Sequence, residues 1–173
     1  MKIPLGYQDS CYIGNMDVSL LVNPDNSVKV INVNDYNNLG YDFQFEAILM
    51  ANSTFGKWTP AVRKERNVST LADIAVLFKS NNETCQSLFT NFEKAEQLAN
   101  EGSELYNAGN VEEGLEKLSQ AIEMFPDNTN FRYLRGQAYM AENDFEKACE
   151  DYTIVRNILT TSPVNDIYPI LCK

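Results

Sequence analysis

The sequence contains no histidine, and this absence narrows the chemistry that the chain can perform. Histidine is the commonest general base, a common metal ligand and the usual partner of a Ser or Cys nucleophile. No phosphate loop, dinucleotide fingerprint or metal-spaced cluster takes its place. We therefore expect no catalytic residues, no metal site and no cofactor. An enzyme that works without histidine stands third, behind two hypotheses of protein binding.

Long apolar runs are also absent. No segment approaches the roughly 20 apolar residues of a membrane-spanning helix, so we expect no membrane insertion of this chain. Pro4 and Gly6 interrupt the first residues before an apolar run forms, which argues against a signal peptide. The hydrophobic fraction of 44% and the charged fraction of 22% are typical of globular proteins.

Basic residues are scarce: 14 Lys and Arg stand against 24 Asp and Glu, which gives a formal net charge of −10. Such a chain repels nucleic acid and anionic lipid, so we expect neither as a partner. One basic cluster occurs, at Arg63, Lys64 and Arg66, and we interpret it as a solvated loop.

Cysteines are few and irregularly spaced. Cys11, Cys85, Cys149 and Cys172 form no CxxC pair and are too sparse to indicate a disulfide framework. Cys149 falls at a predicted helical core position, where we interpret it as a small buried hydrophobic residue.

The composition of the chain changes near residue 85. Before it, Val, Ile, Tyr, Phe and Asn dominate, with turn signals between short apolar runs; after it, Ala, Glu, Leu and Lys dominate at helical spacing. The spacing predicts four helices and a shorter capping segment. These fall over residues 90–107, 111–125, 129–141, 144–160 and about 164–171.

A period of 34 residues aligns Gly102 with Gly136 and Gly114 with Ala148. Small residues at these places let paired helices approach closely, and Pro126 closes the first unit of the repeat. The period and the residue classes resemble the tetratricopeptide repeat over about residues 90–160, with two repeats.

Stacked hairpins of this family form a concave groove, which the first helix of each repeat lines. In one familiar version of this groove, Lys and Asn side chains bind a C-terminal carboxylate. In this sequence the equivalent positions hold Ala99, Ser103, Tyr133 and Gln137, so that carboxylate clamp is absent. The implied groove would suit an apolar peptide or helix. Alternatively, the two repeats act only as a packed spacer. The implied lining is Glu96, Ala99, Ser103, Tyr106, Asn107, Asn130, Tyr133, Gln137 and Met140.

The first half has short alternating apolar runs. Residues 16–33 predict a strand hairpin that turns at Asn23-Pro24-Asp25-Asn26. A helix is expected over 42–51 and a last strand over about 71–79, with a loop between them. The predicted fold class is α+β: a small ββαβ domain followed by an all-α array of helical hairpins with a C-terminal capping segment.

The same half resembles the C-terminal domain of TonB, the energy-coupling protein of Gram-negative bacteria, over about residues 12–80. The sequence segments that carry the resemblance are Ile13–Val28, Glu46-Ala47, Lys57-Trp58-Thr59-Pro60-Ala61 and Val76-Leu77-Phe78-Lys79. Asn26 stands where the family usually has Gly, and it also accepts a positive φ. The family's membrane anchor and Pro-rich spacer do not occur in this sequence.

The TonB resemblance implies peptide binding at an exposed strand edge, where an extended segment of an outer-membrane transporter pairs with unpaired backbone groups. Alternatively, the strand is part of the core or is covered. The resemblance puts the edge at Asp73, Ile74, Ala75, Val76, Leu77 and Phe78.

We therefore expect a TonB-like domain over residues 1–85 and two repeats with a cap over 86–173. The leading hypothesis is a periplasmic, non-catalytic adaptor that binds a protein or peptide partner. The second is a cytoplasmic repeat scaffold, chaperone-like or immunity-like, without a TonB role. The sequence leaves the oligomeric state open.

Overall fold

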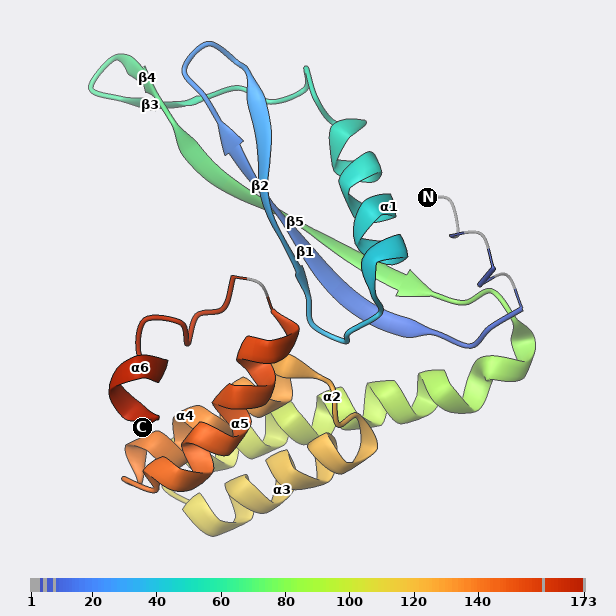
Figure 1. Cartoon of the computed structure of the whole chain (residues 1–173), viewed down its shortest axis with the longest axis vertical. Coiled ribbons are helices and arrows are strands. Elements are labelled where there is room, and N and C mark those ends of the chain that lie inside the picture. Colours follow the sequence, from blue (N-terminus) through green and yellow to red (C-terminus); the bar gives the residue numbers. More distant parts are fainter. Residues whose placement is uncertain (1–3, 5, 8, 160, 173) are drawn as a thin grey trace. The chain divides into compact units, whose positions relative to one another are not determined.

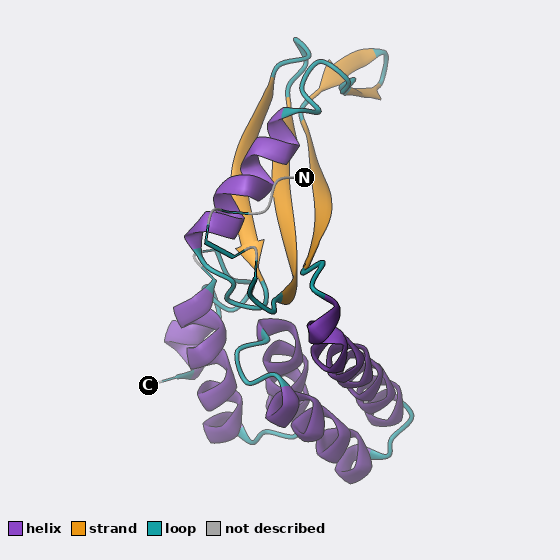
Figure 2. Cartoon of the chain, turned by 90° about the vertical axis from the view of Figure 1, so that its right-hand side faces the viewer, coloured by secondary structure: helices purple, strands orange, loops and turns teal. Residues whose placement is uncertain are grey.

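The computed structural model describes residues 4, 6–7, 9–159 and 161–172, which divide into two compact units. One unit comprises residues 1–35 and 39–82 and contains a sheet with one long helix. The other comprises residues 36–38 and 83–173 and is helical (Figures 1 and 2). A small antiparallel sheet followed by a helical array confirms the predicted α+β class.

A hairpin of two strands, β1 (Ile13–Val22) and β2 (Val28–Asp35), begins the sheet. Every second side chain of β1 from Met16 to Val22 is buried, as its alternating sequence predicts. Asn26 adopts a φ of 65° in the turn, a conformation that Asn tolerates better than most residues. The strands pair antiparallel with one bulge, where Ile31 has no residue opposite it.

The helix α1 (Tyr41–Asn52) covers one face of this sheet with its buried Phe43, Ala47 and Ala51. Figure 2 shows it lying along the strands. The ring of Phe43 meets that of Phe78 edge-on at a centroid distance of 5.2 Å, so helix and sheet share one aromatic core. Phe78 belongs to β5 (Thr70–Lys79), which pairs antiparallel with β1 over all ten of its residues.

The predicted loop between helix and last strand is wrong in one part. Residues 61–68 form a short hairpin of β3 (Ala61–Arg63) and β4 (Arg66–Val68). Its turn residues, Lys64 and Glu65, have φ values of 49° and 63°. A tight hairpin needs positive φ there, and Gly, Asn or Asp normally supply it. The turn was missed because none of those residues is present.

The second unit consists of two antiparallel helix pairs. The first pair is α2 (Gln86–Asn107) with α3 (Val111–Met124), after a short 3₁₀ turn η1 (Glu83–Cys85). The second pair is α4 (Thr129–Ala141) with α5 (Phe145–Ile158). These bounds lie close to the predicted ones, and the largest difference is the earlier start of α2.

Glycine sets the distance within the first pair. A Cβ added at Gly102 would lie 2.8 Å from the carbonyl oxygen of Gly114, and one added at Gly114 would lie 2.8 Å from that of Gly102. In the second pair, the ring of Tyr152 occupies the corresponding space, because a Cβ at Gly136 would lie 2.5 Å from its Cε1. The predicted role of glycine in close helix approach is therefore confirmed.

Replacing Gly102 with Ala should destabilise the helical unit by about 1 kcal/mol. Overpacking costs roughly 1–3 kcal/mol, and the nearest obstructing atom is the backbone carbonyl oxygen of Gly114, which cannot rotate away. The better helix propensity of Ala offsets about 1 kcal/mol of that cost. Urea unfolding followed by far-ultraviolet circular dichroism measures the change. Asn91→Ala, at an exposed position of α2, is the control and should leave stability unchanged or slightly raised. Equal stabilities for both variants would contradict the close approach.

The C-terminal cap is held by a disulfide. α6 (Tyr168–Leu171) packs its Tyr168 and Leu171 against a cluster around Tyr152. Cys149 of α5 is bonded to Cys172, 23 residues further along the chain. The interpretation of Cys149 as a simple buried hydrophobic residue is therefore wrong, and none of the four cysteines is a free thiol. Its partner could not be inferred from spacing, because the bond depends on where the cap folds back.

Removing this bond by the double substitution Cys149→Ala/Cys172→Ala should lower the free energy of unfolding of the helical unit by about 3 kcal/mol. The estimate is the chain entropy of a closed loop of roughly this length. Thermal unfolding followed by circular dichroism measures it. The single variant Ile170→Ala, at a cap residue that is 76% exposed, should have little effect. Unchanged stability of the double variant would show that the cap needs no covalent bond.

Candidate functional site

The strand β5 lies at the edge of its sheet, whose strand order is β2-β1-β5. Among the described residues, β1 is the only strand that pairs with it. Side chains alternate along the predicted edge: Asp73, Ala75 and Leu77 are exposed, whereas Val76 and Phe78 are buried. The strand thus contributes one row of side chains to the core and has one backbone edge with no partner strand in this sheet.

The exposed row of β5 is partly apolar. Leu71 and Leu77 are 66% and 51% exposed. Between them, Asp73 accepts a hydrogen bond of 2.6 Å from the hydroxyl of Ser19, its opposite residue on β1. The strand is therefore fixed in register to β1 while the row that faces away from α1 presents aliphatic side chains.

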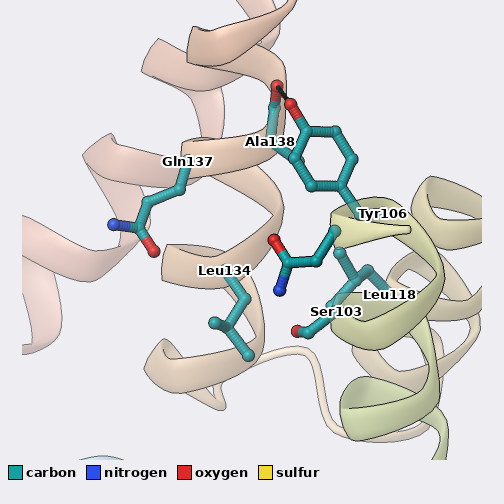
Figure 3. Close-up of a pocket in the computed structure, with 7 residues that line it drawn as sticks. Ser103, Tyr106, Leu118, Leu134, Gln137 and Ala138 are labelled. Carbon is teal, nitrogen blue, oxygen red and sulfur yellow. Dashed lines mark hydrogen bonds between the residues drawn. The ribbon is translucent and has the colours of Figure 1, made fainter. Parts of the chain in front are cut away.

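In the helical unit, two cavities follow the first helices of the two repeats, α2 and α4. One has a volume of about 260 Å³ and lies between Ser103, Tyr106, Asn107, Leu118, Leu134, Gln137 and Ala138 (Figure 3). The other has a volume of about 380 Å³ and lies between Glu96, Ala99, Asn100, Asn130, Phe131, Tyr133 and Leu134. Leu134 lines both cavities, and the two are together named here the repeat groove.

Nearly all residues of the implied lining meet in the repeat groove. Met140 is the exception, because it packs against the cluster around Tyr152. The sequence reasoning missed five lining residues: Asn100, Leu118, Phe131, Leu134 and Ala138. Asn100 and Leu134 follow Glu96 and Asn130 by four residues, so the helical period alone would have found them.

Neutral hydrogen-bonding groups dominate the repeat groove. The hydroxyl of Tyr106 lies 3.4 Å from the carbonyl oxygen of Ala138 (Figure 3). It also lies 3.1 Å from a carboxylate oxygen of Glu142. Burial and the neighbouring Glu142 raise the pKa of Tyr106 above its ordinary value. The side-chain amide of Gln137 donates to the Tyr133 hydroxyl at 3.0 Å. No Lys or Arg lines either cavity, so the groove offers no clamp for a carboxylate.

Arg132 and Arg135 of α4 form ion pairs with the buried Asp151 of α5. The carboxylate of Asp151, which is fully buried, accepts two hydrogen bonds of 2.8 Å from Arg135 and one of 3.1 Å from Arg132. Arg135 also donates to the hydroxyl of Ser119 at 3.0 Å, which joins α3, α4 and α5. Burial alone would lower the pKa of Arg135, but Asp151 raises it above its usual range. The sequence reasoning did not find this network.

The described residues contain no group of three or more metal-ligating side chains. None of the helices in the described segments is both long enough and apolar enough to cross a membrane.

A family model for the tetratricopeptide repeat matches residues 105–150, which run from the end of α2 into α5. No curated protein matches the chain. The family match supports a module for protein–protein interaction, and repeats of this kind are typically non-catalytic. It covers the helical unit alone, so the TonB resemblance of the first unit stays a prediction.

Tyr152 connects the repeat groove to the core, since its ring lies 6.2 Å from that of Tyr133. Burial, followed by the neighbouring Tyr133 and Asp151, raises the pKa of Tyr152 to about 12. The folded state therefore keeps this phenol neutral after the unfolded chain, with a pKa of about 10, has ionised.

The stabilisation from neutral Tyr152 should be fully present below pH ~10 and lost as the pH rises to about 12. Urea unfolding across this pH range should show that the free energy of unfolding decreases as the pH rises. The decrease should be smaller in the variant Tyr152→Phe. Ultraviolet difference titration of the two proteins isolates the phenol itself. Ionisation of Tyr152 near pH 10 in the folded protein would contradict its burial.

Proposed function

We propose that the chain is a non-catalytic adaptor of the periplasm that holds extended polypeptide segments at the edge of β5 and a second partner surface in the repeat groove. The observation that carries this proposal is the edge position of β5, which pairs with β1 over its whole length and with no other described strand. An edge of this kind supplies backbone donors and acceptors in register for an added strand. The tetratricopeptide match supports the second surface.

The chemistry of the edge favours an extended, aliphatic partner. Leu71 and Leu77 both lie on the exposed row of β5, six residues apart, so an added strand would place its own side chains beside them. The TonB resemblance of residues 12–80 points to the same mode of binding and to an outer-membrane transporter as the partner.

The disulfide supports a location outside the reducing cytoplasm. Structural disulfides persist in oxidising compartments such as the periplasm and are rare in cytosolic proteins. Cys149 and Cys172 form such a bond across the C-terminal cap. This observation favours the periplasmic adaptor over a cytoplasmic repeat scaffold.

Strand addition is tested with an array of peptides that have about the length of β5 and are taken from the periplasm-facing segments of outer-membrane transporters. A bound peptide should lose at least about tenfold in affinity when alternate backbone nitrogens are methylated, because each methyl group removes one inter-strand donor. One of the two alternate methylation patterns should weaken binding and the other should not, because successive backbone N–H groups of a strand point to opposite sides. Fluorescence anisotropy measures both.

The protein variant Val76→Pro should abolish the same binding. Because Val76 is buried at 5% exposure, circular dichroism must first show that the unit stays folded. Tyr41→Ala, at an exposed position of α1, serves as the control and should bind normally. If both methylation patterns leave affinity unchanged, the partner does not pair with β5.

A further inference from the structure

The β3–β4 hairpin is a concentrated basic surface on an acidic chain. Arg63, Lys64 and Arg66 are all exposed, and the neighbouring Val62 is 69% exposed. None of the ion pairs between described residues involves these three cations. Glu65, the one acid in the turn, forms no ion pair with them either. Figure 1 shows the hairpin standing out from the end of the sheet.

The arrangement within the hairpin is locally unfavourable. Arg63 and Arg66 are directly opposite each other in the β3–β4 register, and like charges at opposite positions repel. Lys64 and Glu65 adopt left-handed φ values without being Gly or Asn. A local structure that places Arg63 and Arg66 at opposite positions of one hairpin despite these costs is suited to an anion, which would relieve the repulsion.

The base of the hairpin is fixed beside the proposed binding edge. β4 ends at Val68 and β5 begins at Thr70, so only one residue separates the two strands. The side-chain amide of Asn67 donates to the carbonyl oxygen of Pro24 at 3.2 Å. The hydroxyl of Ser69 contacts the side chain of Asn23 at 3.4 Å. These contacts tie the hairpin to the β1–β2 turn at the Thr70 end of the edge.

We propose that the β3–β4 hairpin is an acidic-residue subsite for the peptide that adds to β5, an inference that rests on the proposed strand addition. A peptide antiparallel to β5, the commoner arrangement, leaves the sheet at Thr70 with its C-terminal side. Arg66 lies four residues beyond Thr70, roughly 13 Å away along an extended chain. The partner therefore carries Asp or Glu about four residues C-terminal to its pairing segment.

The charge distribution favours a short acidic segment over a larger polyanion. Nucleic acid or an anionic membrane extends over a large surface and would be repelled by the whole chain, whose formal net charge is −10. A few carboxylates next to the hairpin are attracted by the nearby cations, because charges beyond about 8 Å are screened at physiological ionic strength. Arg63 and Arg66 suit carboxylates in particular, since a guanidinium binds them through two parallel hydrogen bonds.

The test uses the full chain and one pairing peptide from the array, made with three C-terminal extensions: acidic, uncharged and lysine-containing. The acidic peptide should bind about tenfold more tightly than the uncharged one, as two or three exposed ion pairs would provide, and the difference should shrink in high salt. The double variant Arg63→Glu/Arg66→Glu should reverse the order, so that the lysine peptide binds best. Fluorescence anisotropy gives all affinities.

The matched control is Lys29→Glu/Lys57→Glu, which changes the net charge by the same amount at two exposed lysines outside the hairpin. It should keep the preference for the acidic peptide. Equal binding of all three peptides to the unmodified protein would overturn the subsite, even if the hairpin variant failed to fold. An equal loss in the control variant would show a general charge effect and would overturn it too.

The two proposals fail in different ways. If backbone methylation of the pairing segment weakens binding while the extensions make no difference, strand addition stands and the acidic subsite is wrong. If no peptide of the array binds, or if methylation has no effect, both are wrong.

Discussion

The helical unit depends on how closely α2 approaches α3, and two absent side chains set that distance. Gly102 and Gly114 face each other backbone to backbone, with 2.8 Å between each carbonyl oxygen and the place where the other residue's Cβ would lie. Leu118 packs beside Gly102, and Tyr106 beside Gly114. Both residues line the repeat groove. The shape of the groove therefore follows from a contact inside the helix pair, and a methyl group there would move the groove's wall.

In the second pair, α4 and α5, a glycine faces an aromatic side chain and not a second glycine. At Gly136 the missing side chain makes room for the ring of Tyr152, where the first repeat has Leu118. The ring also contacts Tyr133, which lines the repeat groove, so core and surface are coupled through one aromatic contact. Two repeats leave end surfaces that further repeats would otherwise cover. Residues of α6 cover part of the α5 side, and the bond between Cys149 and Cys172 holds them there.

Local sequence was sufficient for the helices and for the strand hairpin. A 34-residue period ties Gly102 to Gly136, and the alternation of Val18, Leu20 and Val22 has only one simple structural meaning. The edge position of β5 is different in kind. Its alternating residues would look the same in a central strand, so the expectation came from a family resemblance and not from periodicity. The disulfide was missed because a separation of 23 residues does not reveal how the chain returns.

The edge of β5 also raises the question of why the chain would not pair with itself. An exposed strand with aliphatic side chains such as Leu71 and Leu77 is a template for aggregation. Asp73 and Lys79 stand in the same exposed row and place charges among the aliphatic residues. Natural proteins protect edges in this way, because a charge disfavours burial in a stack of identical strands while the backbone stays accessible to a chosen partner. If a partner adds to β5 as proposed, the charges of the edge and of the neighbouring hairpin supply the selectivity that backbone pairing by itself cannot.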